Sequence, residues 1–219
     1  EFLTVTHAVN DFCVVEMSNF YLDIIKDRLY CDETDGQSRR SAQTALFLIL
    51  DTMTKIMAPI LCFTCDEIWQ AMPHRESDDG RNVLFNDMNR PFADCALDEE
   101  TMERWNKVIK LRDVVNKALE TARNEKKIGK SLEAKVVLTV PAFETALDGM
   151  DAEALADILI VSQAEVRKSD MNVLKVDVEP AGGAKCERCW KQIASVGSDS
   201  AHSTLCARCA AAVASIPEF

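Results

Sequence analysis

Four cysteines near the C-terminal end place the tightest constraint on what this chain can fold into. Cys186 and Cys189 form one C-x2-C pair, and Cys206 and Cys209 form a second pair after 16 intervening residues. Each short pair can present two thiolates to one ion, and two pairs supply the four-sulfur tetrahedral shell that zinc favours. A tail of about 35 residues cannot bury an adequate apolar core, so metal binding would supply its folding energy. We therefore expect one structural Zn²⁺ held by all four cysteines.

Other uses of these cysteines have to be weighed against zinc. Two disulfides or an iron–sulfur centre would need similar spacing, and His202 could replace one thiolate. The cysteine count is nine, and these residues are scattered along the chain. An odd number of cysteines without a secretion signal favours reduced thiols. A third C-x2-C pair, Cys62 and Cys65, follows an amphipathic helix rather than a strand, so we interpret it as two buried core thiols and not as a redox motif.

The chain before the tail predicts a helical part and then an α/β part. Glycine and proline are scarce, with 7 and 6 residues among 219, which favours helix. Apolar residues at 3–4 spacing predict four helices, over 3–30, 38–58, 59–72 and 98–128, with an irregular stretch at 73–96. Short β-branched runs after Gly129 predict strands, at 134–140, 158–161 and 173–178, with a helix at 151–157.

The predicted fold class is mainly α, in three domains. A helical bundle occupies residues 1–132, a small α/β junction module occupies 133–181, and the zinc-binding tail occupies 182–219. The sequence 180–183, Pro-Ala-Gly-Gly, is the best linker in the chain. The chain begins at Glu1 within an amphipathic pattern, so we expect a piece of a longer protein.

Charge limits the kind of partner. The net charge of −11 argues against binding of polyanions by the whole surface. Two stretches are nevertheless mildly basic: residues 98–135 carry 10 basic and 8 acidic side chains, and residues 184–213 carry 4 and 2. No apolar run approaches the ~18 residues of a membrane span, and no secretion signal is visible. We expect a cytoplasmic protein without membrane association whose contacts with nucleic acid are local.

Basic and aromatic side chains provide the candidates for RNA contact. Arg39 and Arg40 lie at a predicted helix start, and Trp190 either packs against the zinc tail, which we favour, or stacks on a base. The candidates are Arg28, Arg39, Arg40, Arg123, Lys126, Lys127, Lys130 and Trp190, and Lys135 continues the basic run that begins at Arg123. Basic residues beside the cysteines are expected to offset the negative charge of the zinc shell; they are Lys185, Arg188, Lys191 and Arg208. No phosphate-binding G-x-x-x-x-G-K and no catalytic constellation around a histidine is visible.

Several segments together resemble one known family. The sequences of residues 18–30, 39–44, 57–60, 63–69 and 128–134 are similar to segments of bacterial isoleucyl-tRNA synthetases, and so are the two C-terminal cysteine pairs. Cys65 departs from the pattern, since the family more often has a small apolar residue there. The resemblance implies a class I anticodon-binding helical bundle that recognises the anticodon stem-loop of tRNA(Ile).

The resemblance also defines what this chain would lack. In that family, a separate catalytic domain with HIGH-like and KMSKS-like motifs binds ATP and Mg²⁺ and charges tRNA with isoleucine. Neither motif occurs here, and neither does the editing domain. The implied protein is a C-terminal, tRNA-reading part of a monomeric ligase, inactive by itself. Two other classes remain: a stand-alone RNA-binding module and a protein-interaction adaptor with a structural zinc.

Overall fold

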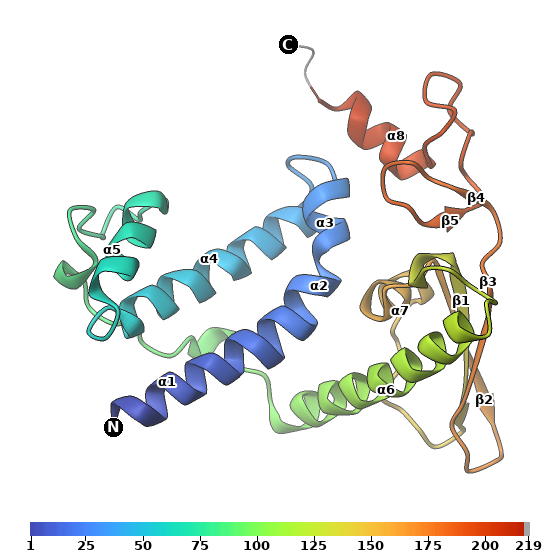
Figure 1. Ribbon diagram of the computed structural model, residues 1–219, viewed down its shortest axis with the longest axis horizontal. Helices are drawn as coiled ribbons and strands as arrows, with labels where there is room; N and C mark the ends of the chain where they lie inside the picture. The colour runs from blue at the N-terminus through green and yellow to red at the C-terminus, as the bar shows by residue number, and fades with distance from the viewer. Residues whose placement is uncertain (217–219) are drawn as a thin grey trace. The chain divides into compact units, whose positions relative to one another are not determined.

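The computed structural model describes residues 1–216 and contains two compact units (Figure 1). The first unit joins Glu1–Asp23 to Asp35–Ala96, and the second unit joins Ile24–Thr34 to the chain from Leu97 onward. Helices predominate and the sheets are small, so the expectation of a mainly α protein with an α/β part is confirmed. The second unit thus takes a segment of 11 residues from within the predicted N-terminal bundle.

The first unit is helical. Its elements are α1 (Phe2–Asp11), the π-helix η1 (Phe12–Tyr21), α4 (Gln37–Met57), α5 (Cys62–Ala71) and the short 3-10 helices η2 (Val83–Phe85) and η3 (Ala93–Cys95). The predicted second helix agrees with α4 to within a residue at each end. The prediction that Pro59 opens the next helix is wrong. The backbone N–H groups of Ile60 and Leu61 both donate to the Met57 carbonyl, at 2.9 and 2.8 Å, and this turn delays α5 until Cys62.

The single helix predicted over residues 3–30 is also wrong. After α1 and η1 the chain continues as α2 (Leu22–Ile24) and α3 (Lys26–Cys31). The break lies at Ile25, which is only 1% exposed and has φ −89° and ψ −2°, away from the ideal helical values. The physical reason is burial: the chain bends so that Ile25 is removed from water, and residues 24–34 belong to the second unit.

A buried ion-pair cluster lies at the centre of the first unit. The Asp51 side chain on α4 is 1% exposed and contacts Lys55 Nζ at 2.9 Å and Arg75 Nη2 at 3.1 Å, while Asn89 Nδ2 donates to it at 2.7 Å. Burial by itself would raise the Asp51 pKa, but the hydrogen bonds from Asn89 and Lys55 and the charges of Lys55 and Arg75 lower it below its ordinary value of 3.8. The cluster ties α4 to the irregular segment 73–96.

The second unit combines α3 with a long helix, two small sheets and the tail. Its further elements are α6 (Glu99–Asn124), the 3-10 helix η4 (Ser131–Glu133), β1 (Ala134–Pro141), α7 (Ala152–Leu159), β2 (Gln163–Ser169), β3 (Lys175–Pro180), β4 (Ala184–Lys185), β5 (Gln192–Ile193) and α8 (Ala207–Ala214). The larger sheet has the order β2-β1-β3, with β2 parallel to β1 through α7 and β3 antiparallel to β1.

Packing against this sheet explains the pattern of α6. Its buried residues include Val108, Val115 and Leu119, which follow the predicted apolar stripe. Figure 1 shows α6 and α7 on the same side of the sheet. Arg112 of α6 is 8% exposed, and its Nε donates to the Ile158 carbonyl of α7 at 3.0 Å. One layer of helix on a three-stranded sheet therefore forms the core of the second unit.

The strand predicted at residues 158–161 is wrong. Helix α7 continues through Leu159, Ile160 adopts a left-handed conformation with φ 55°, and the strand begins at Gln163. A short buried apolar run has the same composition in a helix end as in a strand, so periodicity could not separate them.

The predicted linker at residues 180–183 is not a flexible connection. Gly183 has φ 99°, and a Cβ there would lie 2.5 Å from the Ile193 carbonyl carbon, so only glycine allows β5 to approach so closely.

Helix α6 ends four residues before the predicted Ile128. Lys126 adopts a left-handed conformation with φ 59°. Its N–H donates to the Arg123 carbonyl at 3.0 Å and the Lys127 N–H donates to the Ala122 carbonyl at 2.9 Å, which is the hydrogen-bond pattern of a Schellman C-cap. Lys126 and Lys127 therefore lie in a tight turn beyond the helix.

Among the helices of residues 1–216, none combines the length and the hydrophobicity that crossing a membrane requires.

The Asp51 cluster predicts how the first unit responds to mutation. Asp51→Ala leaves the buried Lys55 ammonium without its closest partner, so we expect the free energy of unfolding to fall by about 3–5 kcal/mol. Because the Asp51 pKa is lowered in the folded state, its contribution is complete above pH 3.8 and is lost as the pH falls through the lowered pKa. Urea unfolding of the wild type and of the exposed control Asp87→Ala checks this, and equal stability of Asp51→Ala and the control would contradict it.

Candidate metal centre and nucleic-acid interface

The four predicted cysteine ligands converge in the second unit. The sulfur atoms of Cys186, Cys189, Cys206 and Cys209 all lie within 4.8 Å of one another, and all four residues are buried. The Cys189 and Cys206 sulfurs are 4.0 Å apart. A tetrahedral Zn²⁺ with bonds of about 2.3 Å places its sulfurs about 3.8 Å apart, so the arrangement fits this ion.

Two different local structures present the two pairs. The β4–β5 hairpin encloses the first pair, and in its tip the Trp190 N–H donates to the Cys186 carbonyl at 2.9 Å. The second pair stands at the start of α8, where Cys206 is the N-cap residue. The Cys206 N–H donates to the Cys186 sulfur at 3.3 Å, which ties one pair to the other. A helix N-terminus favours negative charge and so suits thiolate ligands.

The electrostatics of the four sulfurs call for a cation. Burial raises the pKa of Cys209 to about 11, and the neighbouring cysteines contribute to this rise. Burial also raises the pKa of Cys189. At Cys186 burial acts the same way, but hydrogen bonds from the backbones of Cys189, Cys206 and Arg188 outweigh it and lower the pKa to about 6. Ionisation of all four sulfurs in so small a volume is therefore unfavourable unless a cation offsets their charge, as Zn²⁺ would.

The structure bears on two of the alternatives for the cysteines. No disulfide joins any of the nine cysteines, which all lie within residues 1–216. His202 is not among the four residues whose ligand atoms converge. Cys65 is buried, as expected, and burial raises the pKa of its thiol, but Cys62 is exposed, so the prediction that both are core thiols is wrong for Cys62. Cys62 is the first residue of α5 and faces solvent there.

A fifth cysteine, which sequence reasoning missed, lies near this centre. Cys31 at the end of α3 is 6% exposed and packs in one cluster with the four converging cysteines. Its thiol donates to the Arg188 carbonyl at 3.7 Å. Burial raises its pKa to about 11, which keeps it a neutral thiol. No local pattern around Cys31 indicated this, because the contact joins segments more than 150 residues apart.

Basic residues beside the cysteines were expected to offset the charge of the zinc shell. Three of them instead bind other groups. Arg188 donates to the carbonyls of Tyr30 and Cys31, Arg208 pairs with Asp27 and Asp32, and Lys191 pairs with Asp157 and Asp27. Their charges are therefore used mainly to attach the tail to α3 and α7.

Some predicted RNA contacts come together on the surface of the second unit. Lys130 Nζ lies 5.9 Å from the centre of the Trp190 ring, and Trp190 is 58% exposed with φ 66°. Our preference for a packed Trp190 is thus wrong, because the hairpin tip turns the ring outward. Arg123 Nη2 donates to Ser131 Oγ at 3.3 Å, which joins the end of α6 to the loop that carries Lys130.

The remaining candidates are distributed over both units. Lys126 and Lys127 are exposed in the turn after α6, and Lys127 pairs with Glu125 at 2.7 Å. Arg28 lies on α3 in the second unit. Arg39 and Arg40 lie in the first turn of α4 in the first unit, where Arg40 Nη1 donates to Gln43 Oε1 at 3.5 Å.

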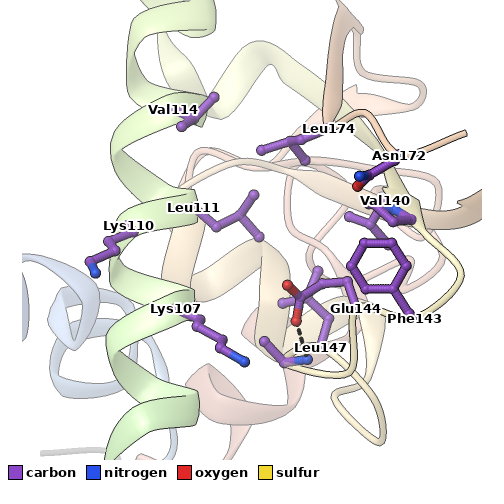
Figure 2. A pocket seen from close by; sticks show the side chains of 12 residues that line it. Lys107, Lys110, Leu111, Val114, Val140, Phe143, Glu144, Leu147, Asn172 and Leu174 are labelled. Atoms are coloured by element: carbon purple, nitrogen blue, oxygen red, sulfur yellow. Dashed lines mark hydrogen bonds between the residues drawn. The ribbon is translucent and has the colours of Figure 1, made fainter.

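A separate hollow of about 400 Å³ opens beside α6 (Figure 2). Its walls are mostly apolar and include Leu111, Val140 and Phe143, and Figure 2 shows the Glu144 carboxylate beside them. Glu144 Oε1 accepts a hydrogen bond from the Ala146 N–H at 2.8 Å. Lys107 and Lys110 of α6 also line the hollow. Base stacking needs an exposed aromatic ring beside the cations, and the surface around Lys130 and Trp190 offers one, so we place the candidate nucleic-acid contact there.

Comparison with known proteins identifies both parts of the chain. Residues 1–138 match the family described as the anticodon-binding domain of tRNA ligase. Residues 183–212, which contain the four converging cysteines, match a zinc finger found in FPG and IleRS. A structural zinc in the tail is thus supported by two independent observations, the cysteine geometry and the family match.

Three similar curated proteins share one name. An isoleucine–tRNA ligase of Syntrophotalea carbinolica is 46% identical over 96% of this chain and 23% of its own length. Those of Caldicellulosiruptor saccharolyticus and Staphylococcus carnosus are each 43% identical, over 94% and 99% of this chain and 22% and 24% of their own lengths. The chain spans about a quarter of the length of these relatives. With a family match over residues 1–138 and a matching zinc finger after it, the chain belongs to the family of anticodon-binding domains of tRNA ligases.

Proposed function

We propose that this chain reads the anticodon stem-loop of tRNA(Ile) as part of an isoleucine–tRNA ligase. One observation carries the proposal: this chain joins an anticodon-binding domain to a zinc finger of this type, and the three relatives, which align with 94–99% of it, are isoleucine–tRNA ligases. In the whole ligase, other domains would bind ATP and Mg²⁺ and charge the tRNA. We expect a monomeric protein that acts in the cytoplasm, divided into a helical domain at 1–132, a junction module at 133–181 and a zinc tail at 182–219.

The zinc would be structural. We assign it to Cys186, Cys189, Cys206 and Cys209, which fill a tetrahedral shell and leave no position for water or substrate. These four thiolates would hold the ion, whose charge would offset half of theirs, and they would join the β4–β5 hairpin to α8. The tail then presents Trp190 next to Lys130.

The exposed basic surface of the second unit is our candidate for the RNA contact. This surface consists of Arg123, Lys126, Lys127, Lys130 and Trp190. Further candidates on other elements are Arg28, Arg39 and Arg40. Bases in an RNA loop can be splayed out and stacked on aromatic rings while lysines bind the phosphates. An exposed tryptophan with a lysine beside its ring offers both kinds of contact.

Anticodon binding can promote a reaction at a distant site. Binding energy from correct anticodon contacts holds the tRNA in one orientation, and this orientation places the acceptor end in the remote catalytic domain. The stacking and phosphate contacts of this chain would then contribute to the selection of tRNA(Ile). They would leave the chemical step to other residues.

The proposed RNA surface predicts a salt-dependent weakening of binding. We expect the triple change Lys126→Ala, Lys127→Ala and Lys130→Ala to weaken binding of tRNA(Ile) and to reduce the log–log salt slope by about 0.7 for each phosphate that no longer meets a lysine. Lys126 and Lys127 lie beyond α6, so helix content should stay constant. Filter binding across a salt series measures both quantities.

A matched control exists on α6 itself. Lys107, Lys110 and Lys117 are exposed on this helix, and their triple change to alanine removes the same charge. The proposal is contradicted if both triple variants keep the wild-type affinity and slope, or if both lose them equally. Equal binding of tRNA(Ile) and of other tRNAs would indicate a general RNA-binding module, and binding of no tRNA would indicate a protein-interaction adaptor.

The zinc assignment predicts one metal ion per chain. We expect elemental analysis of protein purified without added metal to find one equivalent of zinc. Cys186→Ser and Cys209→Ser should each lose it and unfold the tail, because the metal supplies the tail's folding energy. The exposed Cys95 offers a control, since Cys95→Ser should retain the ion. A folded tail in protein that contains no zinc would contradict the assignment.

Because we assign ATP binding and catalysis to other domains of the ligase, we predict that this chain alone does not activate isoleucine. We expect no isoleucine-dependent exchange of pyrophosphate into ATP by the 219 residues of this chain, because the ATP-binding motifs belong to the catalytic domain. A complete isoleucine–tRNA ligase assayed in parallel serves as the positive control. Exchange at a rate proportional to the concentration of this chain would show that our assignment of the chemistry to other domains is wrong.

A further inference from the structure

The two cysteine pairs place an arginine at the same position. Arg188 lies between Cys186 and Cys189, and Arg208 lies between Cys206 and Cys209. Both side chains reach residues 24–34, which precede them by more than 150 positions in the sequence. We call this segment, which contains α3, the clasped segment. We call residues 186–189 and 206–209, which contain the two cysteine pairs, the two knuckles. Arginines at equivalent positions of the two knuckles therefore bind the same segment.

Arg188 binds the C-terminal end of α3. Its Nη2 donates to the Tyr30 carbonyl at 3.1 Å, and its Nη1 donates to the Cys31 carbonyl. The last carbonyls of a helix have no partner within the helix, and a cation there also interacts favourably with the helix dipole. Arg188 thus caps α3 from a distant part of the sequence.

Arg208 binds the acidic residues on either side of that end. Its Nη1 lies 2.6 Å from Asp27 Oδ2 and 3.1 Å from Asp32 Oδ1, and its Nη2 lies 2.9 Å from Asp27 Oδ1. Burial alone would raise the Asp27 pKa, but the hydrogen bond from Arg208 and the charges of Lys191 and Arg208 lower it, so Asp27 stays ionised in this contact. Bidentate arginine–carboxylate contacts of this type are both strong and directional.

The clasped segment has little stability of its own. Helix α3 contains six residues, far fewer than the ~12–15 that make an isolated helix even marginally stable. The tail supplies side-chain contacts that hold it: the two arginines, Lys191, and the burial of Cys31 among the four cysteines. We therefore expect the order of this segment to depend on the tail.

The tail in turn depends on the metal. Each of these arginines lies one or two residues from the cysteines assigned as zinc ligands. Metal binding supplies the folding energy of such a tail, so bound zinc would also fix the positions of both arginines. We propose that Arg188 and Arg208 are positioning residues that transmit zinc binding to α3, so that the metal orders residues 24–34 as well as the tail. This rests on the zinc ligands of the proposed function. Arg28, a candidate phosphate contact, lies on α3, so the metal would also govern that contact.

Amide hydrogen exchange on the full chain tests this coupling. In wild-type protein, removal of zinc by a chelator should speed exchange at residues 26–31 by about tenfold or more, together with residues 186–209. The double change Arg188→Ala and Arg208→Ala should speed exchange at 26–31 to a similar degree while one zinc remains bound. The control Arg81→Ala with Arg167→Ala removes two exposed arginines that pair with neighbouring residues, and it should change neither.

A second pair of changes covers the case in which the arginine variant loses its metal. Asp27→Asn with Asp32→Asn breaks the contact from the side of α3 and leaves the knuckles intact, so zinc should stay while exchange at 26–31 rises. Unchanged protection of 26–31 in a zinc-loaded variant of either kind would overturn the proposal, and so would protection of α3 that survives chelation. Binding of tRNA(Ile) is measured separately, so a failure of the RNA assignment would leave the exchange result standing.

Discussion

The convergence of four sulfur atoms is the interaction on which the C-terminal tail, residues 184–214, depends. Cys186 and Cys189 come from a hairpin, while Cys206 and Cys209 come from the first turn of α8, and neither element has an apolar core of its own. Four thiolates can share so small a volume when a cation offsets their charge, and the zinc finger family match agrees with a bound Zn²⁺. The four cysteines around the ion therefore set the positions of the other side chains of the tail, including Trp190.

The same shell explains why the chain does not divide cleanly along its sequence. Residues 24–34 are covalently part of the N-terminal helices but belong to the second unit. Arg188 and Arg208 contact them there, and the knuckles set the positions of both arginines. The anticodon-binding family match ends at residue 138, within the second unit, so the sequence family and the compact unit overlap without coinciding.

The surface that we propose for nucleic acid is assembled from turns. Lys126 and Trp190 both have left-handed backbone conformations, which are uncommon for residues other than glycine and place their side chains on the outside of tight turns. Lys130 lies in a loop that Glu133 stabilises by accepting from the Gly129 and Lys130 N–H groups. An acidic chain can thus present a small basic and aromatic surface without a basic overall charge.

The sequence alone determined the features whose cause is local. The spacing of the cysteines, the apolar stripe of α6 and the β-branched run of β1 predict metal, helix and strand, because each depends on residues close together in the chain. Tertiary structure decided the rest. The first predicted helix is interrupted at the buried Ile25. The segment predicted as a strand at 158–161 is the end of α7, where Ile160 has a left-handed conformation. Trp190 faces outward because of the conformation of its hairpin. The contact of Arg188 and Arg208 with α3 spans more than 150 residues, and no periodicity within either segment encodes which carbonyls and carboxylates a distant arginine will meet.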